Sequence, residues 1–381
     1  MYRTRRSTRR LLATTCVAVV AWAGVTACGE AGDTGNLPEP GATGSAHDEE
    51  IDVVATGLDA PWSIAFHGET ALVSERDSGR ILELGVAGDS REVGVVDAVQ
   101  PGGEGGLLGI AVHEGDLYSY VTAADGNRIE RRELTGGPGE LGLGEVETIL
   151  DGIPAARVHN GGRIAFGPDG KLYATTGDAG DTSTAQDRDS LAGKILRLEP
   201  DGSVPADNPF PDSPIYSYGH RNPQGIAWDA DGTLYASEFG QNTWDELNII
   251  EPGANYGWPE VEGVAGDGRF VDPVQQFRPA DASPSGMAVA GGAVYIAGLR
   301  GERLIEVPLS DAGESDTATD GYGRLRDVIV APDGALWVLT NNTDGRGRPG
   351  SEDDRILRFD PRKRDPAPAS PPAGQMVIPL I

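Results

Sequence analysis

The stretch RIAFGPDGKLYATTGD (Arg163–Asp178) contains an alternating apolar run, a tight Pro-Asp-Gly turn and a second alternating run. Such a pattern is typical of a β-hairpin, because side chains alternate between the faces of a strand and Asp-Gly pairs suit tight turns. The same two-strand unit occurs six times along the chain. The other five copies are SIAFHGETALVSE (Ser63–Glu75), GIAVHEGDLYSYV (Gly109–Val121), GIAWDADGTLYASEFG (Gly225–Gly240), GMAVAGGAVYIAG (Gly286–Gly298) and DVIVAPDGALWVLTNN (Asp327–Asn342).

The spacing of the copies points to an architecture. They begin at residues 63, 109, 163, 225, 286 and 327, so neighbouring copies lie 41 to 62 residues apart. Repeats of roughly 40–50 residues that each supply about four strands are typical of propeller blades. We therefore predict an all-β chain folded as a six-bladed β-propeller, with an irregular β-sandwich as the alternative. The segment Ile51–Leu58 precedes the first hairpin and is predicted to pair with the last blade, which would close the ring.

A further short strand of shared character follows most of the hairpins. Examples are RILELG after Gly79 and KILRLEP after Gly193. Because Arg and Glu alternate with Ile and Leu in these segments, we expect an outer strand with one wet face.

The composition agrees with a single turn-rich β domain, predicted to span residues 51–361. The chain has 381 residues with 55 Gly and 27 Pro, and no collagen period. Its formal net charge is −28, and removal of the five N-terminal arginines discussed next would give −28 − 5 = −33. Such a surface repels nucleic acid and anionic lipid but is compatible with Ca²⁺ binding. Clustered arginines therefore indicate a functional site more strongly in this acidic chain than they would in a basic protein.

The N-terminus has the pattern of an export signal. Five arginines precede a short apolar run that ends in Val-Thr-Ala-Cys, which resembles a bacterial lipobox. We predict a lipoprotein-type signal peptide over residues 1–27, lipidation of Cys28, and an extracytoplasmic protein anchored to the outer face of the cell membrane. An ordinary signal with an incidental Cys28 is the alternative, and twin-arginine export is a second possible route. Residues 28–50 are expected to form a flexible tether, and residues 362–381 a Pro-rich disordered tail.

Two histidines lie in polar, Gly-rich loops that precede adjacent hairpins. His159 opens the block HNGGRIAFGPDG before the third hairpin, and His220 lies in YGHRNPQGIAW before the fourth. Both loops are expected at the same end of a propeller axis, which is where ligand sites of such folds are built. Taken singly, each residue is better interpreted as an ordinary surface-loop histidine.

Seven blocks in order resemble the soluble PQQ-dependent sugar dehydrogenases of the glucose/sorbosone dehydrogenase family, especially the aldose sugar dehydrogenase branch. The resemblance runs from about Ile51 to Asp360. The blocks are EGGLLGIAV (Glu104–Val112), HNGGRIAFGPDGKLYATTGD (His159–Asp178), LAGKILRLEPDG (Leu191–Gly202), YGHRNPQGIAW (Tyr218–Trp228), EFGQNTWDELNIIEPGANYGWP (Glu238–Pro259), PSGMA (Pro284–Ala288) and GRLRDVIVAPDG (Gly323–Gly334).

The resemblance implies oxidation of an aldose at C1 to a lactone, with hydride passing to PQQ and the electrons to an extracytoplasmic acceptor. His159 matches the catalytic base, and imidazole suits that role because its ordinary pKa is close to working pH. Arg221 and Asn222 match the pair beside the quinone carbonyls, where a guanidinium would stabilise charge that develops on the cofactor.

The remaining cofactor ligands implied by the resemblance are charged. Arg324 and Arg326 match the two arginines that bind PQQ carboxylates, and their i, i+2 spacing puts both on one side of an extended segment. Arg300 falls where the family has a cationic contact with PQQ. Glu104 stands where the glucose dehydrogenase branch has Gln, so a carboxylate is expected near an anionic cofactor.

Calcium is also implied by the resemblance, at two places. One Ca²⁺ would lie beside PQQ on the backbone carbonyls of Gly240 and Gln241, and a structural Ca²⁺ would use Glu246 and the backbone of Tyr256. The acids of TTGDAGD, Asp178 and Asp181, are interpreted as turn residues.

Two other functions remain open at this point. A calcium-dependent lactonase-like hydrolase would need acidic or Asn side chains around the propeller axis, and the arginines argue against that arrangement. A non-catalytic propeller lipoprotein that binds sugars or a protein partner could keep the fold but would not need His159 or the arginines.

Overall fold

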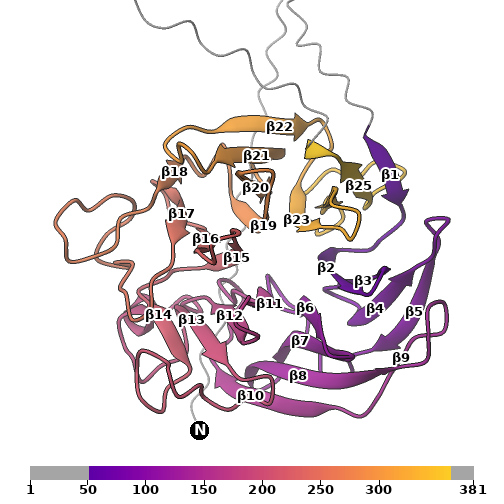
Figure 1. The fold of residues 1–381 in the computed structure, drawn as a ribbon, viewed down its shortest axis with the longest axis horizontal. Helices are drawn as coiled ribbons and strands as arrows, with labels where there is room; N and C mark the ends of the chain where they lie inside the picture. The colour runs from indigo at the N-terminus through magenta and orange to yellow at the C-terminus, as the bar shows by residue number, and fades with distance from the viewer. Residues whose placement is uncertain (1–50, 362–381) are drawn as a thin grey trace, which may run out of the picture. The chain divides into compact units, whose positions relative to one another are not determined.

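The computed structural model describes residues 51–361, and within them six antiparallel sheets surround a central axis (Figure 1). The predicted six-bladed β-propeller is therefore confirmed. The first blade consists of β2 (Pro61–His67), β3 (Thr70–Glu75), β4 (Arg80–Leu84) and β5 (Ser90–Val95). The second consists of β6 (Leu107–His113), β7 (Asp116–Ala123), β8 (Gly126–Thr135) and β10 (Glu147–Ile153), with β9 (Gly142–Leu143) beside β8. The third consists of β11 (Ile164–Phe166), β12 (Leu172–Thr176), β13 (Lys194–Leu198) and β14 (Ile215–Tyr218).

The second half of the ring repeats this plan. The fourth blade consists of β15 (Pro223–Trp228), β16 (Leu234–Glu238), β17 (Asp245–Ile249) and β18 (Gln275–Phe277). The fifth consists of β19 (Pro284–Ala290), β20 (Ala293–Gly298), β21 (Arg303–Pro308) and β22 (Asp316–Asp320). The sixth consists of β23 (Leu325–Val330), β24 (Leu336–Thr340) and β25 (Ile356–Phe359), and is completed by β1 (Asp52–Ala55). The first strand of each hairpin is the innermost strand of its blade (Figure 1). The inner strands contact one another around the axis.

The ring is closed by a strand from the beginning of the described chain. β1 pairs antiparallel with β25, with Asp52 opposite Arg358 and Val53 opposite Leu357. The predicted pairing of Ile51–Leu58 with the last blade is confirmed. Because the sheet of the last blade combines both ends of the described chain, the ring is held shut by backbone hydrogen bonds.

One expectation about the blades is wrong. The short strands that begin with Arg or Lys are third strands and not outer ones, because each is covered by a fourth strand. In β13 (Lys194–Leu198) all five residues are buried. The exposed outer position belongs instead to strands such as β5 (Ser90–Val95), whose burial is irregular along its length.

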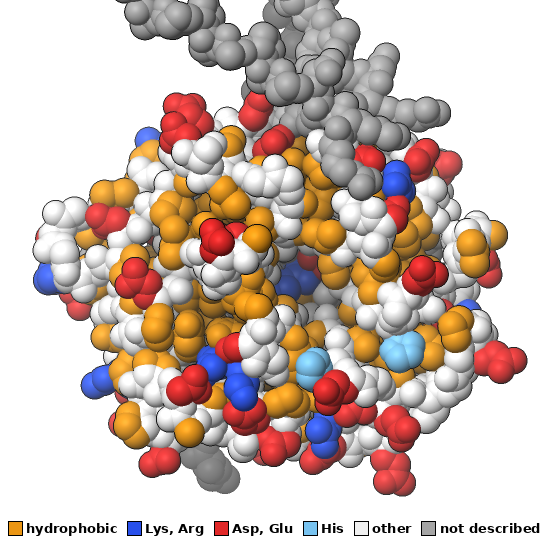
Figure 2. Space-filling view, in the orientation of Figure 1, with side chains coloured by type: hydrophobic (Ala, Val, Ile, Leu, Met, Phe, Trp, Pro, Cys, Tyr) orange, Lys and Arg blue, Asp and Glu red, His pale blue; other side chains and the backbone are white. Residues whose placement is uncertain are grey.

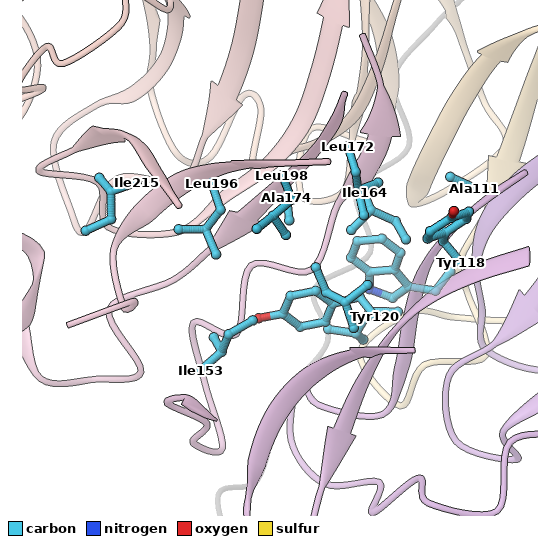
Figure 3. Packing of buried hydrophobic residues seen from close by; sticks show 13 residues of the cluster. Ala111, Tyr118, Tyr120, Ile153, Ile164, Leu172, Ala174, Leu196, Leu198 and Ile215 are labelled. Carbon is cyan, nitrogen blue, oxygen red and sulfur yellow. The ribbon is translucent and has the colours of Figure 1, made fainter. Parts of the chain in front are cut away.

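The hydrophobic core lies between neighbouring blades. Figure 3 shows the cluster between the second and third blades, where Tyr120, Ile164 and Leu172 are fully or almost fully buried. The Tyr120 hydroxyl donates a hydrogen bond to the carbonyl of Asn160 at 3.0 Å. The core thus reaches directly to the loop that precedes β11, and fixes the residue next to His159.

Two structural facts bear on the predicted localisation. Within residues 51–361, no helix is long and apolar enough to cross a membrane. The signal peptide, the lipidation of Cys28, the tether and the C-terminal tail all lie outside the described residues and remain predictions.

Candidate active site

A polar cavity of about 300 Å³ lies on the axis, at the end of the ring where the inner strands begin. In each antiparallel hairpin, the start of the first strand and the end of the second strand are adjacent. Loops from all blades therefore gather at this end. The cavity is lined by Trp62, Arg76, Glu104, His159, Arg221, Asn222, Gln224, Phe239, Gly240, Gln241, Asp245, Pro279, Ser283, Leu299, Arg300, Arg324, Arg326 and Arg346.

Most of the site residues proposed from the sequence meet in this one cavity. Those that line it are Glu104, His159, Arg221, Asn222, Gly240, Gln241, Arg300, Arg324 and Arg326. Glu246 and Tyr256 lie elsewhere, around a small neighbouring cavity. His220 is fully buried and does not line the central cavity.

His159 is oriented by a buried carboxylate. Its Nδ1 lies 2.7 Å from Oδ1 of Asp178, so Nδ1 carries the proton and Nε2 is the basic nitrogen. The other carboxylate oxygen of Asp178 accepts a hydrogen bond from Trp258 Nε1 at 2.9 Å. Burial by itself would raise the pKa of Asp178, but the hydrogen bonds from His159 and the Gly180 amide outweigh burial and lower it. Asp178 is therefore a charged partner of the candidate base and not merely a turn residue, as the sequence had suggested.

The backbone around His159 is held in an uncommon conformation. His159 has φ 57°, a left-handed value that is uncommon for a residue with a side chain. Its amide donates to Oε2 of Glu104 at 2.8 Å. A Cβ at Gly177 would lie 2.0 Å from the His159 carbonyl oxygen, so only glycine permits this close approach. Glu104 thus positions the His159 loop, which explains how a carboxylate is accommodated here.

Arg221 and Asn222 are placed by a buried glutamate. The carboxylate of Glu238 accepts hydrogen bonds from the backbone amides of both residues. Its other oxygen lies 2.8 Å from Nδ1 of His220, whose Nε2 contacts the Ser217 hydroxyl. The role of His220 is therefore to support the Arg221–Asn222 turn from behind, which is a structural task.

The Arg221 guanidinium itself reaches the cavity. Its Nη1 donates to the carbonyl of Phe239 at 3.2 Å, and its carbon lies 5.5 Å from the centre of the Trp258 ring. Burial lowers the pKa of Arg221, although nearby carboxylates oppose this shift. Asn222 presents its side-chain oxygen to the Gly161 amide at 3.0 Å, which ties this turn to the His159 loop.

Arg324 and Arg326 lie side by side, as their spacing predicts. Between them lies the buried carboxylate of Asp344, 3.1 Å from Arg324 Nη2 and 3.9 Å from Arg326 Nη2. Arg326 also donates to Oε1 of Gln224 at 2.9 Å and to Oδ1 of Asn341 at 3.1 Å. These contacts leave few degrees of freedom, so both guanidinium groups are pre-positioned.

Several residues of the site were not found from the sequence. Arg76 and Arg346 add two cations, and Arg346 Nη1 lies 3.3 Å from Oε1 of Glu104. Asp245 accepts from the amides of Gly240 and Ser283 at 2.9 and 2.8 Å, and burial raises its pKa to about 6. Neither arginine lies in one of the seven blocks that resemble the family, so there was no local sequence signal for them.

The charge balance of the cavity is the reverse of the charge balance of the protein. Six arginines line it, against the two carboxylates of Glu104 and Asp245, while the whole chain has a formal charge of −28. Among the described residues, the buried Nε atoms of Arg221 and Arg324 have no hydrogen-bond partner. A cavity with surplus guanidinium groups and unsatisfied donors fits a ligand with several carboxylates and carbonyls.

The second cavity is small and acidic. It is about 10 Å³ and is lined by Glu238, Glu246, Tyr256 and Glu262, among others. Burial, and then the proximity of Glu238, raises the pKa of Glu246 to about 8. The Glu246 carboxylate accepts from the Gly263 amide at 2.6 Å and from Asn248 Nδ2 at 3.1 Å. Two buried acids side by side call for a shared proton or a cation.

The loop that leaves the fourth hairpin connects the two cavities. Oε1 of Glu262 accepts hydrogen bonds from four consecutive amides, from Gln241 to Trp244, at 2.7 to 3.1 Å. These bonds fix the backbone of Gly240 and Gln241 at the wall of the central cavity. Within residues 51–361, no cluster of three or more His, Cys, Asp or Glu side chains has the arrangement of a metal site. A cation at either cavity would therefore need backbone carbonyls in addition to any carboxylate ligand.

Comparisons with known proteins identify relatives of this arrangement. Quinoprotein glucose dehydrogenase B of Acinetobacter calcoaceticus is 32% identical over 273 residues, which are 61% of this chain and 57% of that protein. Aldose sugar dehydrogenase YliI of Escherichia coli (strain K12) is 30% identical over 342 residues, covering 77% of this chain and 91% of that protein.

Solved structures extend the comparison. The PQQ-bound form of aldose sugar dehydrogenase from Streptomyces coelicolor superimposes with a TM-score of 0.78 at 52% identity, covering 81% of this chain and 97% of that one. A gluconolactonase from Xanthomonas campestris reaches a TM-score of 0.50 at 14% identity, which is a likeness of fold alone. The model of the glucose/sorbosone dehydrogenase family matches residues 58–357. The chain therefore belongs to the glucose/sorbosone dehydrogenase family.

Proposed function

We propose that this protein is a PQQ-dependent aldose dehydrogenase that oxidises sugars at C1 to lactones. The observation that carries the proposal is the meeting of an Asp-oriented histidine with six arginines in one cavity of about 300 Å³. PQQ, when bound, supplies an o-quinone that accepts the electron pair of the sugar. A sugar would bind in the same cavity, where His159 would receive the proton of its C1 hydroxyl.

His159 takes the proton of the C1 hydroxyl at Nε2. Because Nδ1 donates to the Asp178 carboxylate, the imidazole presents its basic nitrogen to the cavity and the imidazolium that forms is stabilised. Asp178 keeps its charge because its pKa is lowered. The pair therefore works as a base with an orienting partner, in which the proton moves to Nε2 only.

The arginines hold the anionic cofactor. Arg324 and Arg326, fixed around Asp344, would bind the carboxylates of the cofactor, and Arg300 and Arg346 would add positive charge. Arg221 and Asn222 face the reacting end of the site, where the guanidinium stabilises negative charge on an oxygen. The unpartnered Nε of Arg221 is a donor that such an oxygen would satisfy.

Calcium is the second component of the proposal. One Ca²⁺ would use the carbonyls of Gly240 and Gln241 together with the cofactor, in the loop fixed by Glu262. The other would take Glu246 and the carbonyl of Tyr256, where two buried acids otherwise repel each other. Hard cations with flexible coordination accept such oxygen ligands.

The alternatives have weaker support. A metal-dependent lactonase needs a ring of acidic or Asn ligands on the axis, and in this cavity six arginines outnumber Glu104, Asp245 and Asn222. A purely sugar-binding propeller has no use for the His159–Asp178 pair. Export, a lipid anchor at Cys28 and an extracytoplasmic electron acceptor remain part of the proposal that follows from the sequence alone.

A reconstitution assay tests the function. The purified protein is mixed with PQQ and Ca²⁺, and reduction of a dye is followed with several aldoses. We expect reduction that depends on PQQ; its absence with every aldose overturns the proposal. The variant His159→Ala should lose turnover while PQQ still binds, as measured by a titration of cofactor absorbance. Turnover retained by this variant refutes the assignment of the base.

A further inference from the structure

Lys194 is a buried cation of the third blade that has no part in the proposed mechanism. Figure 2 shows Lys and Arg side chains on one face of the molecule, several of them beside acidic side chains. Lys171, which precedes β12, is of this ordinary kind, because its ammonium lies 2.6 Å from a carboxylate oxygen of Glu199 and its side chain is 25% exposed. Lys194, the first residue of β13, is instead fully buried. A fully buried lysine is rare, because taking its charge out of water is costly.

Three backbone carbonyls hold this buried ammonium. Nζ of Lys194 donates to the carbonyl oxygens of Thr184 at 2.8 Å, Ala185 at 3.1 Å and Ala192 at 2.6 Å. An ammonium group has three N–H donors, so each donor has one acceptor. Burial lowers the pKa of Lys194 to about 8, and the negative charge of Asp187 opposes this shift, so the group is still protonated at neutral pH. The carbonyl oxygens therefore surround a cation, as they do around a bound hard metal ion.

The ammonium ties together the two ends of the loop between β12 and β13. We call this loop, residues 177–193, the clipped loop. Two of the three carbonyls belong to the end of the short 3₁₀ helix Thr182–Ala185, and the third, of Ala192, lies just before β13. The packing is tight, since a Cβ at Gly193 would lie 2.9 Å from the Cα of Ala185. Without the ammonium, three carbonyl oxygens of like partial charge would face one another in a buried space, which is unfavourable.

The clipped loop carries the carboxylate that orients the candidate base. The backbone carbonyl of Asp178 accepts hydrogen bonds from the Asp181 amide at 2.9 Å and from Thr184 Oγ1 at 3.4 Å. Gln186, the residue after the short helix, donates from Nε2 to the carbonyl of Trp258 at 2.7 Å. The Trp258 indole in turn donates to Oδ2 of Asp178 at 2.9 Å. The clipped loop thus holds Asp178 both through its backbone and through its side chain.

The same loop supports the turn that carries Arg221. The carbonyl of Ala185 accepts from Lys194 and also from the amide of Gly219 at 3.0 Å, two residues before Arg221. The carbonyl of Arg221 accepts from the amide of Asp178 at 2.8 Å. One buried cation therefore lies where the segment of the candidate base's partner and the segment of the guanidinium are joined.

We propose that Lys194 is a positioning residue of the active site, whose ammonium takes the place of a bound cation and keeps Asp178 in contact with His159. The effect on catalysis rests on the proposed function, whereas the effect on the hydrogen bond between His159 and Asp178 does not. Loss of the ammonium should loosen the clipped loop and free the imidazole. Arg324 and Arg326 belong to the other side of the cavity, at the sixth blade, and should keep their places.

The buried ammonium is tested first, on the full chain without cofactor. The chain contains three lysines, so a sample with nitrogen-15 in its lysine side chains gives at most three Nζ signals in an NMR spectrum. Near neutral pH we expect one ammonium signal whose hydrogens exchange slowly with water. It should be absent from Lys194→Met and present in the matched control Lys171→Met. A slowly exchanging signal that is missing from the wild type, or that persists in Lys194→Met, overturns the buried ammonium.

The position of Asp178 is tested on samples labelled in histidine. The Nδ1 hydrogen of His159, identified by its loss in His159→Ala, lies against the Asp178 carboxylate and should exchange slowly in the wild type. We expect exchange to be roughly tenfold faster or more in Lys194→Met and unchanged in Lys171→Met. If Lys194→Met does not fold, Lys194→Gln, which keeps two N–H donors without the charge, is judged by the same criterion. Exchange at the wild-type rate in the Lys194 variant overturns the proposal.

The catalytic consequence is tested with PQQ, Ca²⁺ and an aldose. We expect Lys194→Met to lower kcat roughly tenfold to a hundredfold, as small misplacements of catalytic groups do, and to change the Kd for PQQ by less than about threefold. An unchanged kcat, or a fall of kcat that only follows weaker PQQ binding, refutes the positioning role. Absence of turnover in the wild type would refute the proposed function, and the two exchange measurements would still decide the role of Lys194.

Discussion

Asp178 holds the imidazole of His159 through a hydrogen bond of 2.7 Å and is itself held by the indole of Trp258 at 2.9 Å. The orientation of the candidate base therefore depends on a chain of three side chains from two blades. Because Asp178 is fully buried, no solvent molecule can take its place without rearrangement.

The first prediction follows from this relationship. The substitution Asp178→Asn removes the charge that stabilises the imidazolium and allows the wrong tautomer. Loss of general-base catalysis is typically worth a factor of about 10²–10⁴. We expect kcat to fall by roughly that factor, with PQQ affinity nearly unchanged, in steady-state assays with an aldose. Asp181→Asn, at the exposed cap of the short helix Thr182–Ala185, is the control. Equal kcat values for Asp178→Asn and the wild type would contradict the pairing.

The second prediction concerns the cofactor. Arg324→Ala should weaken PQQ binding roughly tenfold to a hundredfold, because a hydrogen bond to a charged group contributes about 1.5–3 kcal/mol. Titration of PQQ absorbance gives the Kd directly. Arg269→Ala is the control, since the Arg269 side chain is 63% exposed and pairs with surface acids. If both variants bind PQQ as the wild type does, Arg324 is not a ligand.

The third prediction is a pH dependence of stability. The pKa of Glu246 is about 8 in the folded protein against an ordinary value of 4.5, so between these pH values the folded state holds a proton that the unfolded state releases. Stability without calcium should therefore fall as pH rises from about 5 to 8. Calcium should raise Tm more at pH 8 than at pH 5, because a cation replaces the proton.

Thermal unfolding with a chelator and with calcium checks this prediction. In Glu246→Gln, which cannot ionise, the pH-dependent part should be reduced and the calcium effect lost. A calcium-induced rise of Tm that is equal at both pH values in the wild type would count against a cation at Glu246.

The fourth prediction concerns ring closure. Leu58 is 2% exposed and packs in the core between the last and first blades. Leu58→Ala should lower the free energy of unfolding by about 2–5 kcal/mol, the usual cost of such a truncation in a core. Urea unfolding measures the change, and Val86→Ala, at a fully exposed position, should leave stability unaltered. A wild-type midpoint for Leu58→Ala would show that the closure contributes little.

The parts of the fold that could be predicted are those with a strong local pattern. Hairpins such as Arg163–Asp178 combine alternation with Gly-Asp turns, so their sequence alone shows both strands and their register. Apart from β1, the fourth strands could not be found, because strands such as β5 and β22 (Asp316–Asp320) are exposed or half-buried at most positions and carry no regular apolar alternation. Their pairing is decided by the neighbouring third strand.

The residues of the candidate site can also be separated into those that the sequence predicts and those that it does not. His159, Arg221 and Arg324 lie in blocks with a recognisable order, and the structure brings them to one cavity. Asp178 was not predicted to be a site residue, because an acid in a Gly-Asp-Ala-Gly turn cannot be distinguished from an ordinary turn residue by sequence. Arg346 lies in the loop between β24 and β25, outside the seven blocks that resemble the family, so its place in the site follows only from the folded chain.

The pairing of β1 with β25 has a consequence for how the protein folds. The strands that must meet are from opposite ends of the described chain, so the ring is among the last features to form, and contacts of this range make folding slow. Arg326 lies on β23 of the same last sheet, and Arg324 immediately precedes that strand. A chain stopped short of that sheet would hold His159 with no counterpart across the cavity. Closure of the ring therefore also completes the wall of the cavity, because the sheet that β1 closes is the one that carries Arg326.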